Sequence, residues 1–259
     1  MKSLIQKTDA TKRIRKRPGR KTILIALLLF LLSLVAACAI YLDDYYRADK
    51  AAAAVLTAPA DGITILEQKN DRITFTPEDP VAGLIFYPGG KVQYEAYAPL
   101  MEACAGQGIL CVLLHMPFNL AVLDANAADA VIGDYPEITD WYIGGHSLGG
   151  AMAAAYAAGH SDELRGLILL AAYPTKNLDN SRLKVLSVYG SEDGVLNMDS
   201  YTAAKDYFPN ETVEHLIEGG NHAYFGSYGN QKGDGTAGIG NAEQVSQTAA
   251  LVSGFMTAG

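Results

Sequence analysis

Cysteine is scarce in this chain, which has three cysteines in 259 residues: Cys38, Cys104 and Cys111. Their spacing matches no metal-binding motif, and three thiols are too few to build a disulfide framework in place of a hydrophobic core. Cys104 and Cys111 form either a bridge or a pair of buried thiols. The chain also lacks internal repeats and low-complexity tracts, which excludes repeat architectures and compositionally disordered classes.

Basic residues become scarce after residue 21. The first 21 residues hold nine Lys or Arg and one acid, Asp9, whereas the rest of the chain holds 11 basic and 27 acidic residues. Nucleic acid is bound by surfaces rich in Lys and Arg, because its phosphates are negative. The acidic remainder of the chain therefore indicates that nucleic acid is not a partner.

Charged residues are absent from positions 22–42, an apolar run of 21 residues. A helix of that length spans about 30 Å, the thickness of a bilayer's hydrocarbon core. The basic residues 1–21 are expected to stay in the cytoplasm as a tail, which puts the chain after residue 42 on the outer side. We therefore expect a signal-anchor helix at 22–42 and a stalk at 43–62.

Two alternatives to an uncleaved anchor remain open. The sequence Val35-Ala36-Ala37-Cys38 resembles a lipobox, which would make the chain a lipoprotein attached through Cys38. Small residues around Ala37 also resemble a signal-peptide cleavage site, which would release a secreted domain.

Residues 63–259 are expected to form one α/β domain with a mostly parallel sheet. The chain is 49% hydrophobic, enough for one sizeable core, and continuous apolar runs such as CVLLH and GLILLAAY are typical of strands buried on both faces. Helical and strand patterns alternate, which is typical of crossover connections. Strands are expected at 63–66, 72–75, 82–87, 109–115, 141–143, 164–171, 183–189 and 213–217, and helices at 94–105, 123–131, 148–158, 198–207 and 242–256.

A candidate nucleophile lies in the hexapeptide Gly145-His146-Ser147-Leu148-Gly149-Gly150. A strand pattern precedes it and an alanine-rich helix pattern follows it, so Ser147 is expected on a sharp strand-to-helix turn. Residues two before and two after such a serine need to be small, because the strand end and the helix start pass close together.

Two downstream residues are candidates to activate this serine, which is a weak nucleophile unaided. Asp193 directly follows an expected strand in Gly190-Ser191-Glu192-Asp193, and His222 follows the last strand in Gly219-Gly220-Asn221-His222. The order Ser, Asp, His along the chain is the one expected when such groups hang from successive strand ends. Glu192 is the alternative acid and His115 the alternative base.

Backbone N–H groups are needed to stabilise the oxyanion of an acyl-transfer intermediate. Leu148 supplies one candidate, because it follows the serine at a helix N-terminus. Gly90 is the other candidate, in the loop Tyr87-Pro88-Gly89-Gly90-Lys91, where Gly89 permits the bend.

Together the motifs PGG, GHSLGG, GSEDG and GGNH make residues 63–259 resemble an α/β-hydrolase, of the compact bacterial branch related to dienelactone hydrolases. Those enzymes use cysteine where this chain has Ser147, so their ring-opening reaction is not carried over. The resemblance implies hydrolysis of a small carboxylic ester through an acyl-enzyme, with no metal or cofactor. A peptidase or acyltransferase with the same triad, or a non-catalytic anchored binding module, are the alternatives.

The expected domain lacks a cap, because about eleven residues separate Ala172 from Leu183. An open cleft is therefore predicted, and it is expected to suit short rather than long acyl chains. Its candidate substrate contacts are Gly89, Phe118, Asn119, His146 and Phe225.

Overall fold

The computed structural model of the chain describes residues 19–68, 72–179 and 181–258. Most of the expected cytoplasmic tail, residues 1–18, lies outside the described residues. The chain divides into two compact units, one up to Asp44 and the other from Tyr45 onward. Each is described by itself.

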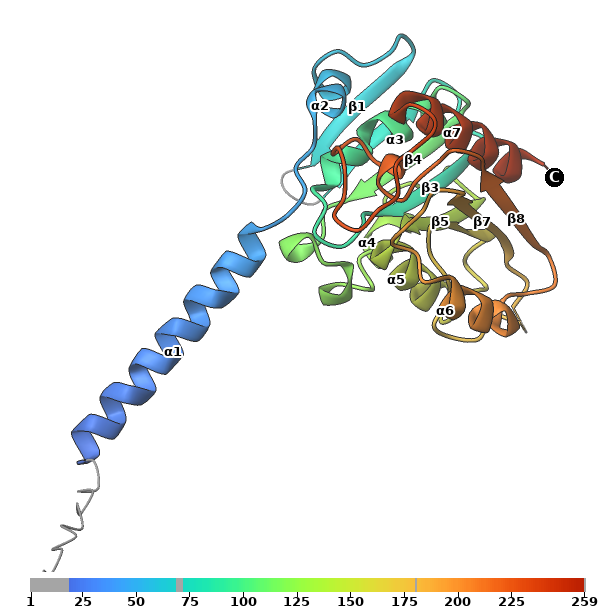
Figure 1. Cartoon of the computed structure of the whole chain (residues 1–259). Coiled ribbons are helices and arrows are strands. Elements are labelled where there is room, and N and C mark those ends of the chain that lie inside the picture. Colours follow the sequence, from blue (N-terminus) through green and yellow to red (C-terminus); the bar gives the residue numbers. More distant parts are fainter. Residues whose placement is uncertain (1–18, 69–71, 180, 259) are drawn as a thin grey trace, which may run out of the picture. The chain divides into compact units, whose positions relative to one another are not determined.

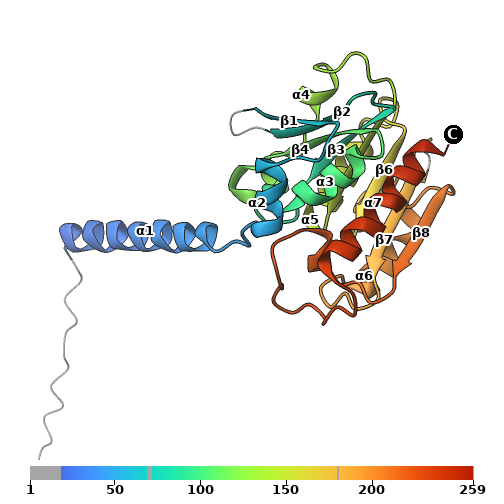
Figure 2. The same ribbon diagram turned by 90° about the horizontal axis from the view of Figure 1, so that it is seen from above.

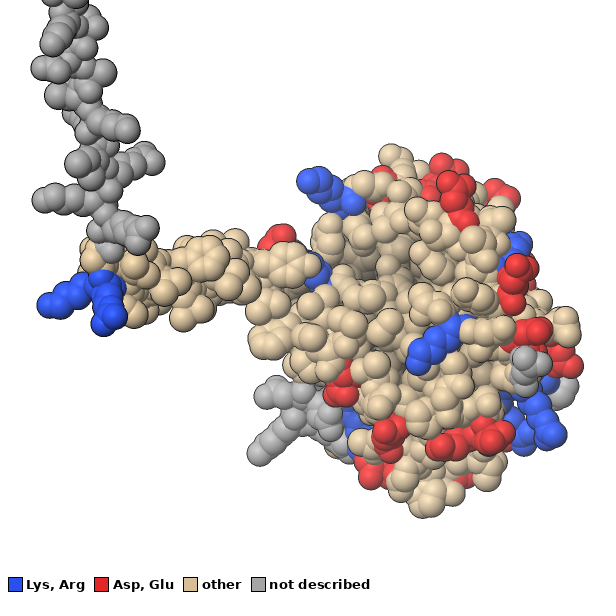
Figure 3. Space-filling view, turned by 90° about the horizontal axis from the view of Figure 1, so that it is seen from below, with Lys and Arg blue, Asp and Glu red and all other residues tan. Residues whose placement is uncertain are grey.

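In the first unit the described residues 19–44 form one helix, α1 (Arg20–Asp43), which has no buried residue (Figure 1). The mean hydropathy of its most apolar 18-residue stretch is 3.1. It is uncharged between its ends (Figure 3), as the sequence of residues 22–42 requires. By length and composition it could cross a membrane, although an N-terminal signal sequence has the same properties.

The second unit is built on an eight-stranded sheet with the order β1-β2-β4-β3-β5-β6-β7-β8. Strands β1 and β2 pair antiparallel, β2 pairs antiparallel with β4, and the other neighbours are parallel. The mostly parallel sheet predicted from the apolar runs is therefore confirmed. The strands are β1 (Ile63–Gln68), β2 (Arg72–Pro77), β3 (Ala82–Tyr87), β4 (Ile109–Leu114), β5 (Trp141–His146), β6 (Gly166–Leu170), β7 (Lys184–Gly190) and β8 (Thr212–Ile217).

Helices cover both faces of this sheet (Figures 1 and 2). On one face α3 (Ala98–Ala105) and α7 (Asn241–Thr257) pack over side chains such as Leu84 and Phe86. On the other face α4 (Asp129–Ile132) and α5 (Leu148–Ala157) pack over Ile85 and Val112. Side chains alternate between the two faces along each strand, so the central strands are buried on both sides.

Several expected helices differ from the structure. The helix expected at 94–105 begins as a 3-10 turn, η1 (Tyr94–Tyr97), before α3, and the one at 198–207 divides into α6 (Met198–Ala203) and η4 (Ala204–Tyr207). The helix expected at 123–131 is wrong, because the chain instead forms η2 (Pro117–Asn119), η3 (Ala121–Leu123) and the short α4. Asp124 and Asn126 in this stretch favour turns over helix.

Residues 45–62, expected as part of a stalk, lie in the folded unit. They include a helix, α2 (Lys50–Thr57), whose Ala52 is fully buried and whose Val55 and Leu56 pack against the core. Between β6 and β7 the described residues 171–179 and 181–183 form no helix or strand, so no cap is found there.

Candidate active site

Ser147 lies between the end of β5 and the start of α5, as the sequence predicts. Its φ of 53° and ψ of −121° are unusual for a residue with a side chain, a strain typical of functional turns. A Cβ on Gly145 would lie 2.6 Å from the Gly149 carbonyl carbon, and one on Gly149 would lie 2.3 Å from the backbone oxygens of Tyr87 and Pro88. The start of α5 therefore lies too close to the end of β5 and to the loop after β3 for a larger residue at either glycine.

His222 and Asp193 form a buried pair beyond the ends of β8 and β7. The distance from His222 Nδ1 to Asp193 Oδ2 is 2.9 Å, and the side chains are 1% and 2% exposed. Asp193 Oδ1 also accepts the backbone N–H groups of Val195 and Leu196, at 2.9 and 2.7 Å. A carboxylate that accepts Nδ1–H leaves Nε2 of a neutral imidazole as a proton acceptor.

The Nε2 atom of His222 is buried and has no hydrogen-bond partner among the described residues. His222 and Ser147 line one cavity of about 250 Å³. The apolar part of the lining is Leu148, Ala151, Ala171, Ala172, Val195 and Leu196, and the polar neutral part includes Tyr173, Thr175 and Asn197. A serine and a histidine whose Nε2 has no partner therefore line the same small cavity, and its lining contains no Lys, Arg, Asp or Glu.

The alternative acid and base lie elsewhere. Glu192 is exposed, and its carboxylate accepts the hydroxyl of neighbouring Ser191 at 3.1 Å. The His115 ring lies against that of Tyr94, with 4.7 Å between their centroids.

Gly90 and Leu148 lie close together. A Cβ on Gly90 would come within 2.8 Å of Leu148 Cδ2, so the loop after β3 lies directly against the first residue of α5. The next residue, Lys91, has a φ of 59°, and its N–H donates to the Asn119 carbonyl at 2.8 Å. The structure therefore brings together the two segments whose N–H groups are the oxyanion candidates.

The candidate substrate contacts are distributed differently from the expected cleft. Among the described residues, the lining of the 250 Å³ cavity includes none of the five. Phe118 is 61% exposed, and Asn119 binds the Lys91 N–H through its carbonyl. Phe225 and His146 are buried, with ring centroids 5.7 Å apart, so they pack behind the site. Direct contact with a substrate does not fit this burial.

His146 is held by a residue that the motifs did not indicate. Its Nδ1 lies 2.7 Å from the hydroxyl of Tyr97, which also accepts the Gly89 N–H at 3.0 Å. Its ring centroid lies 4.5 Å from that of His222. Burial, followed by the electrostatic interaction with His222, lowers the pKa of His146 well below 6.5, so His146 is neutral at pH 7.

Asp234 is a second residue without a sequence signal for its role. Its carboxylate accepts four backbone N–H groups, from Gly194, His222, Ala223 and Gly235, at 2.8 to 3.2 Å. It therefore joins the segment after Asp193 to the segment that carries His222. Within the described residues, no group of three His, Cys, Asp or Glu side chains could hold a metal ion.

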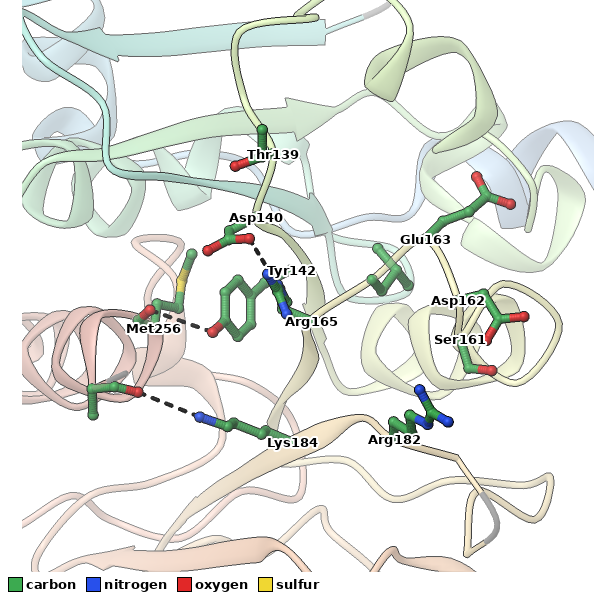
Figure 4. Close-up of a pocket in the computed structure, with 12 residues that line it drawn as sticks. Thr139, Asp140, Tyr142, Ser161, Asp162, Glu163, Arg165, Arg182, Lys184 and Met256 are labelled. Carbon is green, nitrogen blue, oxygen red and sulfur yellow. Dashed lines mark hydrogen bonds and ion pairs between the residues drawn. The ribbon is translucent and has the colours of Figure 1, made fainter.

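A larger cavity, of about 600 Å³, lies at the amino-terminal ends of β5, β6 and β7, whereas the smaller cavity lies beyond the carboxyl ends of the strands (Figure 4). Two of the larger cavity's basic side chains have partners of their own. Arg165 binds Asp140 at 2.7 Å, and Lys184 donates to the Ala258 carbonyl at 3.5 Å. It lacks the nucleophile and base found together in the smaller cavity, which is therefore the candidate active site.

Comparison with known proteins identifies a family and similar folds. The model of a family described as "Alpha/beta hydrolase family" matches residues 83–246. No curated protein sequence matches the chain.

Similar solved structures include a predicted CIB-like hydrolase from Thermoplasma acidophilum, with 16% identity and a TM-score of 0.54 over 74% of this chain and 100% of that one. TT1662 from Thermus thermophilus has 14% identity and a TM-score of 0.54 over 76% of this chain and 99% of that one. Est1E from Butyrivibrio proteoclasticus has 17% identity and a TM-score of 0.53 over 76% and 98%. At these identities the likeness establishes the fold alone.

Proposed function

The chain belongs to the alpha/beta hydrolase family, and we propose that it is a serine hydrolase that cleaves carboxylic esters. The observation that carries this proposal is the buried His222–Asp193 pair, whose partnerless Nε2 belongs to a residue lining the same cavity as Ser147. The narrower likeness to dienelactone hydrolases rests on the four sequence motifs, and Ser147 in place of cysteine separates the chemistry.

In the proposed reaction the Ser147 hydroxyl oxygen attacks the ester carbonyl carbon while its proton passes to His222 Nε2. The carbonyl oxygen becomes an oxyanion, which the N–H groups of Leu148 and Gly90 stabilise. The intermediate collapses when the bond to the alcohol oxygen breaks and His222 gives that oxygen its proton. Water then attacks the acyl-enzyme by the same steps, releasing the acid and restoring Ser147. Asp193 holds the imidazole in the required tautomer throughout.

The cavity supports a short, uncharged group on one side of the ester. Its volume of about 250 Å³ lies below the roughly 300–1,000 Å³ usual for drug-sized ligands. Its neutral lining offers no counter-charge, and burying an unpaired charge is costly. With acyl and alcohol groups varied in turn, one series should lose activity as the chain lengthens. In that series an uncharged group should be preferred over a charged group of similar length, such as butyryl over hemisuccinyl if the series is the acyl one.

A fluorophosphonate probe tests the proposed chemistry directly. We expect one equivalent to label Ser147, with labelling lost in Ser147→Ala and strongly reduced in His222→Ala. Ester turnover in either variant should fall by about four to six powers of ten. Ser161→Ala, in the opposite cavity, is the matched control and should react like wild type. An unreactive wild-type protein would refute the proposal. Release of free acid from esters, rather than cleavage of amides or transfer to another alcohol, separates an esterase from a peptidase or acyltransferase.

The proposed location follows from α1. Its apolar length suits a membrane anchor, and the basic residues before it favour a cytoplasmic N-terminus and an external catalytic domain. A protease added to intact cells should then digest the domain. Intact-mass measurement separates the full-length anchor from a form lipidated at Cys38 or cleaved near it.

A further inference from the structure

Residues 46–49, called the clasp below, pair with the loop that contains Gly90. The Tyr46 N–H donates to the Lys91 carbonyl at 2.7 Å, and the Gln93 N–H donates to the Tyr46 carbonyl at 2.8 Å. The Ala48 N–H adds a bond to Gln93 Oε1 at 3.0 Å. The clasp thus pairs like a short strand with the backbone that follows the proposed oxyanion donor.

The clasp also binds the loop that follows His222. The Asp49 N–H donates to the Ser227 carbonyl at 2.9 Å, and the Lys232 N–H donates to the Tyr46 hydroxyl at 3.0 Å. The Tyr46 and Tyr228 rings lie 5.5 Å apart. One short segment therefore binds the loops that carry or follow two groups of the proposed mechanism, Gly90 and His222.

The clasp is itself fixed in place. Asp49 caps α2 by accepting the N–H groups of Ala51 and Ala52, at 2.8 and 3.1 Å, and Ala52 is fully buried. The loops it joins are irregular, and Lys91 has a left-handed backbone. Irregular loops depend on such bonds for their positions, because no helix or strand ladder holds them.

We propose that residues 46–49 position both halves of the active site. This inference rests on the proposed serine-hydrolase function. The clasp follows Cys38, so the anchored, lipidated and cleaved forms weighed above would all retain it.

Tyr46→Ala in the full-length, detergent-solubilised protein tests this role. It removes the hydroxyl and the ring contact with Tyr228. The turnover number per fluorophosphonate-titrated Ser147 should fall by roughly ten- to a hundredfold, as expected for a small misplacement of catalytic groups, with KM within about twofold of wild type. Tyr46→Phe keeps the ring and should recover part of this loss. Tyr207→Ala, at an exposed position in η4, is the matched control and should retain wild-type turnover.

Hydrogen exchange gives a readout that does not depend on catalysis. Amides of residues 89–93 and 224–232 should exchange faster in Tyr46→Ala, while those of β5 and β6 keep their protection. Gln93→Leu, which removes the acceptor for Ala48, should show the same pattern even if Tyr46→Ala fails to fold. Wild-type turnover per titrated site in Gln93→Leu and Tyr46→Phe, with unchanged exchange, would overturn the clasp while leaving the proposed function standing. An unlabelled wild type would overturn the function instead.

Discussion

The Tyr97 hydroxyl lies 2.7 Å from His146 Nδ1 in the buried space behind Ser147. Because the same hydroxyl accepts the Gly89 N–H, it can donate its own proton to Nδ1, which satisfies Nδ1 and the Gly89 N–H, whereas His146 Nε2 is buried without a hydrogen-bond partner among the described residues. A Cβ on Gly89 would lie 2.7 Å from this hydroxyl and 2.8 Å from Nδ1, so only glycine leaves room for the bond. Tyr97 therefore links the residue before the proposed nucleophile to the proposed oxyanion loop.

Tyr97→Phe should lower the turnover number about tenfold and affect KM much less. The change leaves the Gly89 N–H and His146 Nδ1 buried without a partner, at a cost of about 1–3 kcal/mol for each group. The loop would shift to relieve that cost. Steady-state kinetics with a short-chain ester checks this, with Tyr207→Phe on exposed η4 as the control. Equal turnover in the two variants would show that the hydroxyl does not position the loop.

Stability should fall in acid because His146 is buried and neutral. The folded-state pKa of His146 is lowered below its usual 6.5, so the unfolded chain binds a proton there that the folded chain does not. This group's contribution is therefore present above pH 6.5 and is lost as the pH falls toward the folded pKa, at up to about 1.4 kcal/mol per pH unit. Urea unfolding at pH 7.5 and 5.5 should show a smaller difference in His146→Gln than in wild type. His215→Gln, on exposed β8, should match wild type.

The parts of the fold that follow from local pattern were predictable. The apolar runs predicted the parallel strands, and the glycines around Ser147 predicted the turn. Both features depend on residues that lie close together in the sequence. The Tyr97–His146 contact could not be read from the sequence, because 49 positions separate the two residues and Tyr97 belongs to none of the motifs. The position of Phe225 inside the core, and of residues 45–62 against it, likewise depends on packing between distant segments.

Asp234→Asn should lower the turnover number without abolishing folding. One carboxylate accepts four N–H groups from the segments after Asp193 and around His222, whereas an amide offers a single acceptor oxygen. At least one N–H would lose its partner, and the His222–Asp193 pair would be held less firmly. A drop of about tenfold per titrated Ser147 is expected, with exposed Asp206→Asn as the control. Unchanged kinetics would assign Asp234 to the loop's own stability.

Gly149→Ala should destabilise the domain, whereas Gly159→Ala should not. The new methyl at position 149 would lie 2.3 Å from the backbone oxygens of Tyr87 and Pro88, and backbone atoms cannot rotate away as a side chain could. The start of α5 would therefore have to move from the β3 loop, at a cost of about 1–3 kcal/mol. At position 159 the nearest atom would be the Tyr156 carbonyl oxygen at 3.6 Å, an ordinary contact, so the change should stay within about 0.5 kcal/mol. The free energy of unfolding of both variants can be measured by urea unfolding.

The same movement separates Gly90 from Leu148, so fluorophosphonate labelling of Gly149→Ala should slow even under conditions where the protein is fully folded. Normal labelling by folded Gly149→Ala would show that the close approach of these two segments is not needed for reactivity.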